Sequence, residues 1–248
     1  MPEHLNLFYL MTGFVAFLIG ISKGGLGGTP GALATPLMML VMPAKQVIGL
    51  LLPILMFADV FAVAVHWKRW DRRLVILLIP GAIVGVTVAT NFIKNAPTRT
   101  IQVALGVIVL FFVLYKVFEK RILSALHYQS HNWHGLVAGT VAGFSSGLAH
   151  TGGPPVSIYL LMQNITPGVF NATAALFFTI LNWIKVPYYL YAGLFEWHRL
   201  FQIVWLLPLV PLGVWVGKRL SDRINKQVFD QVITLLLAVA GLLLIIGL

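Results

Sequence analysis

Two ionisable residues stand inside long apolar stretches of this sequence. Asp59 lies within residues 46–66 and Lys185 within residues 169–193. A charge in such surroundings is costly unless it is paired or faces water. The two residues could pair with each other, or act separately as a proton carrier and an anion contact; a purely structural ion pair is the alternative.

Two glycine-rich interruptions supply a second set of candidates. Residues 22–30 read SKGGLGGTP, and residues 150–155 read HTGGPP. Proline suits the first turn of a helix, so we expect a short helix to begin at Pro30 and another at Pro154 or Pro155. Free N–H groups and the positive end of the helix dipole at such N-termini attract anions. The predicted anion-binding residues are Lys23, Gly24, Gly25, Gly27, Gly28, Thr29, His150, Thr151, Gly152, Gly153 and Lys185.

Each of these residues also has a structural interpretation. The glycines could serve close packing between helices. His150 could donate to an anion, carry a proton together with Asp59, or simply cap a helix. Asn164, Asn171 and Asn182 are interpreted as ordinary interhelical hydrogen-bonding residues.

The amino-acid composition indicates the environment in which these residues lie. Of 248 residues, 59% are hydrophobic and only 10% are charged, against about 25% charged in a soluble domain. The mean hydropathy is +0.91. The net charge of +10 comes from cations scattered through short loops, which argues against nucleic-acid binding. The sequence therefore predicts an all-α polytopic membrane protein.

Several chemistries find no support in the residue types. Without cysteine, disulfides, cysteine-ligated zinc and thiol nucleophiles are excluded. The sequence contains no phosphate-binding Walker loop and no HExxH motif. We therefore expect neither an enzyme nor a cofactor or resident metal.

Apolar stretches near the length of a membrane span predict about 8–10 transmembrane segments. The initial run is interpreted as the first span, because the chain lacks the positive start of a signal peptide. Residues 30–42 and 154–162 are too short to cross and are predicted to be half-helices, either crossing or re-entrant. The eight longer segments are 5–22, 46–66, 74–93, 100–118, 133–149, 169–193, 199–217 and 229–248.

Cations in short loops mark the cytoplasmic side of a membrane protein. Three loops are rich in them and fall on one side of the predicted topology, which places both termini on the opposite, extracytoplasmic side. The cations of these loops are Lys68, Arg69, Arg72 and Arg73, then Lys116, Lys120 and Arg121, then Lys218, Arg219, Arg223 and Lys226.

The chain also resembles itself at an offset of about 125 residues. Gly27-Gly28 aligns with Gly152-Gly153, and the separation of Asp59 from Lys185 is 126. The basic loop follows the third segment in the first half and the fourth in the second, so the halves have opposite orientation. We expect two inverted repeats, residues 1–122 and 133–248, joined by a linker at 123–132, as in many secondary transporters.

The segments SKGGLGGTPGALATPLMM and GLAHTGGPPVSIYLL resemble those of the TauE/SafE sulfite and organosulfonate exporters. The resemblance extends over nearly the whole chain. It implies a secondary transporter that moves sulfite or small organosulfonates outward across a bacterial inner membrane, with substrate bound at residues 24–29 and 150–154.

The combined hypothesis is an exporter of a small sulfur-containing anion that works by alternating access. Its expected partners are the anion, the lipid bilayer and, if transport is coupled, protons. A channel-like anion pore on the same scaffold is one alternative. A membrane enzyme or assembly partner that uses the buried loops for catalysis or docking is the other. The sequence leaves open the exact substrate, the coupling ion and the oligomeric state.

Overall fold

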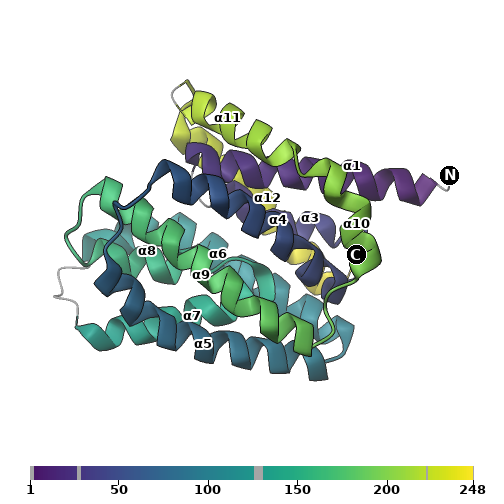
Figure 1. Cartoon of the computed structure of the whole chain (residues 1–248), viewed down its shortest axis with the longest axis horizontal. Helices are drawn as coiled ribbons and strands as arrows, with labels where there is room; N and C mark the ends of the chain where they lie inside the picture. Colours follow the sequence, from purple (N-terminus) through teal and green to yellow (C-terminus); the bar gives the residue numbers. More distant parts are fainter. Residues whose placement is uncertain (1–2, 27–28, 126–130, 222, 248) are drawn as a thin grey trace.

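The computed structural model describes residues 3–26, 29–125, 131–221 and 223–247, and within these ranges the regular structure is helical, with no strand (Figure 1). The long helices of the first half are α1 (Glu3–Ile21), α4 (Ala44–Val65), α5 (Arg72–Asn95) and α6 (Thr98–Ala125). Those of the second half are α7 (Asn132–Ala149), α9 (Pro167–Tyr191) and α12 (Lys226–Ile246). The shorter elements are η1 (Ser22–Leu26), α2 (Thr29–Ala32), α3 (Ala34–Met38), α8 (Gly153–Leu161), α10 (Trp197–Ile203), η2 (Val204–Leu206) and α11 (Leu209–Ser221).

Six of the described helices are long and apolar enough to cross a membrane: those at residues 7–25, 44–65, 72–95, 98–119, 167–191 and 227–246. The bent pair of α10 and α11 provides a seventh candidate. The prediction of an all-helical polytopic membrane protein is therefore confirmed. The predicted segment 133–149 does form α7, but the polar residues of its first turn and its many glycines leave it less apolar than the other long helices.

Two predicted segments are interrupted. Residues 199–217 were expected to form one span, yet the helix bends by 49° between Leu206 and Leu209. Pro208 lies at this bend, where it removes a backbone donor and obstructs the preceding turn. The half-helix expected over 30–42 is likewise divided into α2 and α3, with Pro36 inside the second piece. By contrast, α8 matches the predicted half-helix to within one residue at each end.

Glycines set the closest helix contacts. A Cβ added at Gly81 or Gly85 of α5 would collide with the backbone of α7, and one added at Gly139 of α7 would collide with that of α5. The same relation holds between α1 and α11, where Gly20 and Gly213 face each other's backbone. Small residues four apart let membrane helices approach in this way. The close-packing interpretation thus applies to these glycines, which lie outside the two breaks.

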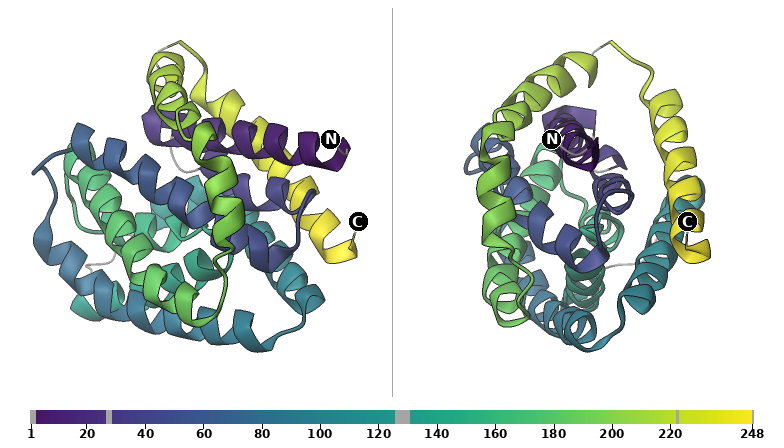
Figure 2. Two further views of the ribbon diagram at one scale, coloured as in Figure 1. Left: turned by 45° about the vertical axis from the view of Figure 1, so that its right-hand side comes forward. Right: turned by 90° about the vertical axis from the view of Figure 1, so that its right-hand side faces the viewer.

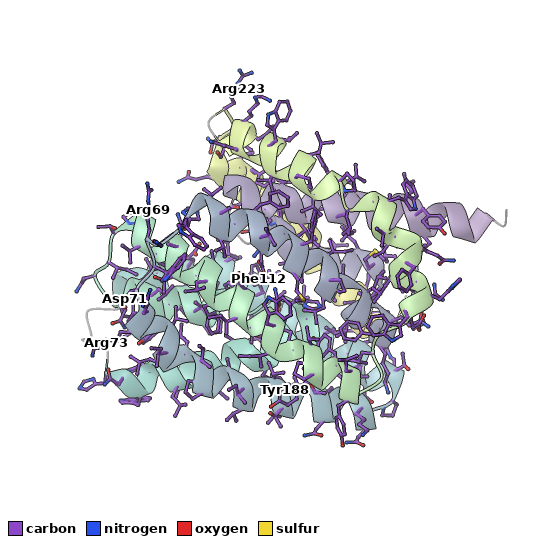
Figure 3. The ribbon with its side chains drawn as sticks, in the orientation of Figure 1. Arg69, Asp71, Arg73, Phe112, Tyr188 and Arg223 are labelled. Atoms are coloured by element: carbon purple, nitrogen blue, oxygen red, sulfur yellow. The ribbon has the colours of Figure 1, made fainter. Side chains whose placement is uncertain are left out.

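The two ends of the bundle differ in charge. Arg69, Arg73 and Arg223 lie toward one end (Figure 3), whereas the two termini lie toward the other (Figure 1). Because α6 runs back antiparallel to α5, its basic C-terminal part reaches the same end as Arg72. Viewed along the bundle, α6 and α12 line one side and α9 to α11 the other, with α1 and α3 between them (Figure 2). The first interruption, which follows directly from α1, therefore lies inside the bundle.

Candidate functional site

The first break follows directly from α1. The helix passes into the single wide turn η1, and Gly25 adopts φ 131°, a conformation that side chains rarely permit. This kink ends the helix and leaves Lys23 pointing toward α4. The Lys23 Nζ atom lies 2.7 Å from Oδ1 of Asp59 and 5.8 Å from the centre of the Phe178 ring.

The second break follows α7 and is fixed by hydrogen bonds from other helices. The hydroxyl groups of Tyr189 and Thr35 donate to the carbonyl oxygens of Gly147 and Ala149, at 2.7 and 2.9 Å. These bonds satisfy carbonyls that a helix C-terminus leaves free. The next residue, His150, has φ 55°, which is uncommon for a residue with a side chain. Its Nε2 atom lies 3.1 Å from the carbonyl oxygen of Ile48 in α4.

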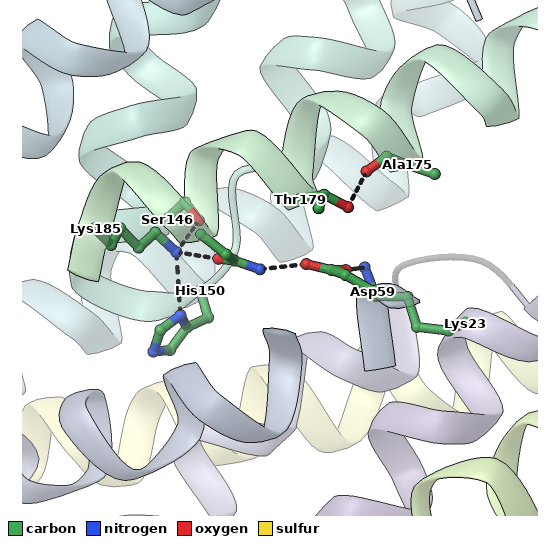
Figure 4. Close-up of polar contacts among 8 residues, drawn as sticks. Lys23, Asp59, Ser146, His150, Ala175, Thr179 and Lys185 are labelled. Carbon is green, nitrogen blue, oxygen red and sulfur yellow. Dashed lines mark hydrogen bonds and ion pairs between the residues drawn. The ribbon is translucent and has the colours of Figure 1, made fainter. Parts of the chain in front are cut away.

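A row of polar side chains joins the two breaks (Figure 4). The side-chain amide of Asn182 donates to Oδ2 of Asp59 at 2.7 Å, and its Oδ1 accepts from Lys185 at 2.9 Å. Lys185 also contacts Ser146 Oγ at 2.7 Å and His150 Nδ1 at 3.3 Å. Asp59 and Lys185 are both 0% exposed. The two buried charges are thus bridged by an amide, and the ion pair of Asp59 is with Lys23.

A cavity of about 350 Å³ lies beside this row. Lys23 and His150, the two ends of the row, both line it, whereas Asp59 and Lys185 stand behind its wall. Toward the basic end of the bundle it is bounded by His66 and Asn171. The other polar residues of its wall are Ser22, Thr151 and Ser157, and its larger apolar residues are Ile19, Leu55, Phe112, Phe170 and Phe178.

Two features of the wall are suited to an anion. Thr151 is 5% exposed, and its hydroxyl has no hydrogen-bond partner among the described residues. It directly precedes Gly152 and Gly153 at the N-terminus of α8, where the helix dipole is positive. Pro154 and Pro155 lack N–H groups, so the backbone offers fewer donors than a half-helix normally would. The ammonium group of Lys23, whose side chain is 21% exposed, also lines the cavity, and its charge is balanced by Asp59.

His66 follows α4 at the mouth of the cavity, outside the membrane-spanning segments. Partial burial, and to a lesser degree the neighbouring Arg69 guanidinium, lower the pKa of the His66 imidazole. His66 is therefore predominantly neutral at pH 7.

The predicted site residues divide into four groups. Lys23, Gly25, His150, Thr151, Gly152 and Gly153 line the cavity. Gly24 instead packs on the backbone of α11, and Thr29 is buried at the start of α2. Lys185 reaches the cavity only through His150. Gly27 and Gly28 lie outside the described residues.

Sequence reasoning missed Asn182 as the link between the two buried charges, and Ser146 and His66 altogether. A signal for two of them was present. Asn182 stands one helical turn before Lys185, and Ser146 one turn before His150, a spacing that brings side chains together on one helix face.

An all-helical chain with six helices able to span a bilayer and a charged row in its interior is a multi-pass membrane protein. The family model for the sulfite exporter TauE/SafE matches residues 12–244, and the chain belongs to this family. The predicted resemblance is thereby confirmed, and the family is one of transporters. No curated protein and no solved structure matches the chain.

Proposed function

We propose that the protein binds a small sulfur-containing anion, sulfite or an organosulfonate, in the cavity between the two breaks and exports it by alternating access. The observation that carries this proposal is the pairing of Lys23 with Thr151 in the wall of one cavity, beside the N-terminus of α8. A lysine ammonium, a free hydroxyl and a helix N-terminus all stabilise oxyanions. Membership in the TauE/SafE family supports the sulfur chemistry of the anion.

The helix contacts support the predicted inverted repeat. Helix α5 of the first half packs along α7 of the second, and α11 of the second half packs along α1 of the first. Helices α1 and α7 occupy corresponding positions in the two halves, and so do α5 and α11. The two contacts are therefore equivalent, as a pseudo-twofold axis would require. Such repeats underlie alternating access in other transporters, in which one half moves against the other around a fixed central site.

The direction of transport is proposed from charge. The cavity is bounded by His66 near the basic residues Arg69 and Arg73, which the distribution of cations assigns to the cytoplasm. An exporter must take its substrate from that side. In this orientation both termini are extracytoplasmic and the membrane is the bacterial inner membrane.

Transport into proteoliposomes tests the proposal. The purified protein is reconstituted, and uptake of labelled sulfite, a two-carbon sulfonate, sulfate and a neutral amino acid is compared. We expect saturable uptake of sulfite or the sulfonate. Flux that rises linearly with concentration would favour the channel-like pore, and absence of flux for every anion would refute the proposal.

A further inference from the structure

The buried row contains one more cation than it contains anions. Lys23 and Lys185 are the cations, and Asp59 is the carboxylate. Lys23 is neutralised by its direct ion pair, whereas the partners of Lys185 among the described residues are neutral groups. Asp59 and Lys185 are the charged residues that are fully buried among those the structure describes.

The hydrogen bonds of the row fit a neutral His150 and a charged Lys185. The carbonyl of Ile48 can only accept, so Nε2 of His150 carries the proton and Nδ1 of the neutral ring accepts from Lys185. The Oδ1 atom of Asn182 also accepts, because its amide nitrogen donates to Asp59. With Ser146 Oγ as a third partner, Lys185 has one acceptor for each N–H of a charged ammonium group.

Among the described residues, the neighbouring elements add no second carboxylate. Besides Lys23 and His150, the titratable residue that lines the cavity is His66 at its mouth, and it is neutral at pH 7. The charged side chains of α11 near this region, Lys218 and Arg219, are exposed at the end of the bundle. The excess positive charge of the interior therefore has no counterion within the described residues.

We propose that the empty site carries one net positive charge and that a monovalent anion neutralises it. The membrane potential would then act on the return of the empty carrier, while the loaded carrier crosses as a neutral complex. This inference rests on the proposed function and specifies the energy source for transport through that same site, namely the membrane potential. It requires no coupling proton from Asp59 or His150, because both have their partners in the row.

The sign of this effect favours export. A potential that is negative inside draws a positively charged empty site back toward the cytoplasm, ready to bind the next anion. Each 100 mV supports an outward gradient of a monovalent anion of about 50-fold. A divalent anion would leave one uncompensated negative charge in a medium of low dielectric constant, so we expect it to be a poor substrate.

The test compares net efflux with exchange in proteoliposomes whose potential is set by potassium and valinomycin. Net efflux of labelled ethanesulfonate into an anion-free medium requires the empty carrier to return. Exchange of labelled for unlabelled ethanesulfonate at equal concentrations does not. We expect a potential of −100 mV to accelerate net efflux several-fold relative to 0 mV, by at most about 50-fold, and to leave exchange unchanged.

Two outcomes would overturn the inference. One is exchange that responds to potential as strongly as net efflux does, because the loaded carrier would then be charged. The other is net efflux that ignores potential and follows a pH gradient, which would indicate coupling to a proton. Absence of flux under every condition would instead refute the proposed function itself.

Substitution of Lys185 sharpens the test. Lys185→Met removes the excess charge, so the loaded carrier becomes negative and exchange should acquire the dependence on potential that wild-type exchange lacks. Lys185→Arg retains the charge, so its exchange should stay independent of potential whatever its rate. Exchange by Lys185→Met that stays independent of potential would contradict the inference. If Lys185→Met does not fold, the inference is tested by comparing the uptake of ethanesulfonate and of 1,2-ethanedisulfonate by the wild type. Equal uptake of the monovalent and the divalent anion would contradict the inference.

Discussion

The two breaks in the chain occupy corresponding places but present different chemistry. Each break contains a residue with positive φ, and these two residues, Gly25 and His150, are 125 positions apart. The first break contributes a lysine side chain and is followed by a helix of only four residues. The second contributes a histidine and a threonine hydroxyl, followed by a helix of nine residues.

This difference shows how two breaks at corresponding positions can bind one ligand through different chemical groups. A cation on a flexible side chain supplies charge, and a hydroxyl beside a fixed helix N-terminus supplies direction. Two half-helix N-termini alone would supply neither the lysine cation nor the polar row behind it. The predictions that follow test each side separately.

The largest effect is expected at the entrance to α8. A Cβ at Gly153 would meet nothing within 4 Å, because the residue borders the cavity. Gly153→Leu should therefore fold and insert normally but fill the anion site and abolish transport, measured as labelled sulfite uptake. Gly168→Leu, at another open position away from the cavity, is the matched control. Normal uptake by Gly153→Leu would show that the N-terminus of α8 does not bind the anion. Gly27→Leu tests the first break in the same way, and we expect it to abolish uptake as well.

The ion pair of the first break gives the next effect. Asp59→Asn leaves Lys23 without its counterion and should lower the free energy of unfolding by about 3 kcal/mol, measured by thermal or denaturant unfolding in detergent. Adding Lys23→Met should restore more stability than adding Lys185→Met, because Lys23 contacts Asp59 directly and Lys185 only through Asn182. The reverse order would mean that Asp59 and Lys185 are the true pair.

A smaller effect is expected from the hydroxyl of the second break. Thr151→Val keeps the side-chain shape but removes a donor that no described residue uses. We expect the KM for the anion to rise about 5- to 10-fold, with unchanged thermal stability. Thr90→Val is the control, since its hydroxyl is also buried without a partner but lies on α5 away from the cavity. Equal effects of the two substitutions would argue against an anion contact at Thr151.

The smallest effect concerns the mouth of the cavity. Because burial lowers the pKa of His66, this ring is neutral at pH 7 and gains a proton only on the acid side of its ordinary value of 6.5. His66→Gln should leave sulfonate flux at pH 7.5 within about twofold of wild type. A sulfonate keeps its charge from pH 7.5 to acid pH. A change in wild-type flux that occurs only at acid pH and is absent in His66→Gln would therefore be assigned to protonation of the His66 ring. A twofold or larger loss at pH 7.5 would show another role.

Local patterns were enough to predict much of this molecule. The glycines and prolines located both breaks, and the length of the apolar run placed α8 within one residue. The bend at Pro208 was missed, because the surrounding run is apolar enough to resemble one continuous span. The partner of Asp59 was not predictable, because a contact between Lys23 on η1 and α4 depends on how two helices pack.

The central claim is that one anion binds between the two breaks. Equilibrium binding of labelled sulfite and ethanesulfonate to the purified wild-type protein, Gly153→Leu and Gly168→Leu tests this most directly, with circular dichroism to confirm that each variant is folded. The account predicts one saturable site in the wild type and in Gly168→Leu, and none in Gly153→Leu. Wild-type affinity in folded Gly153→Leu would contradict it.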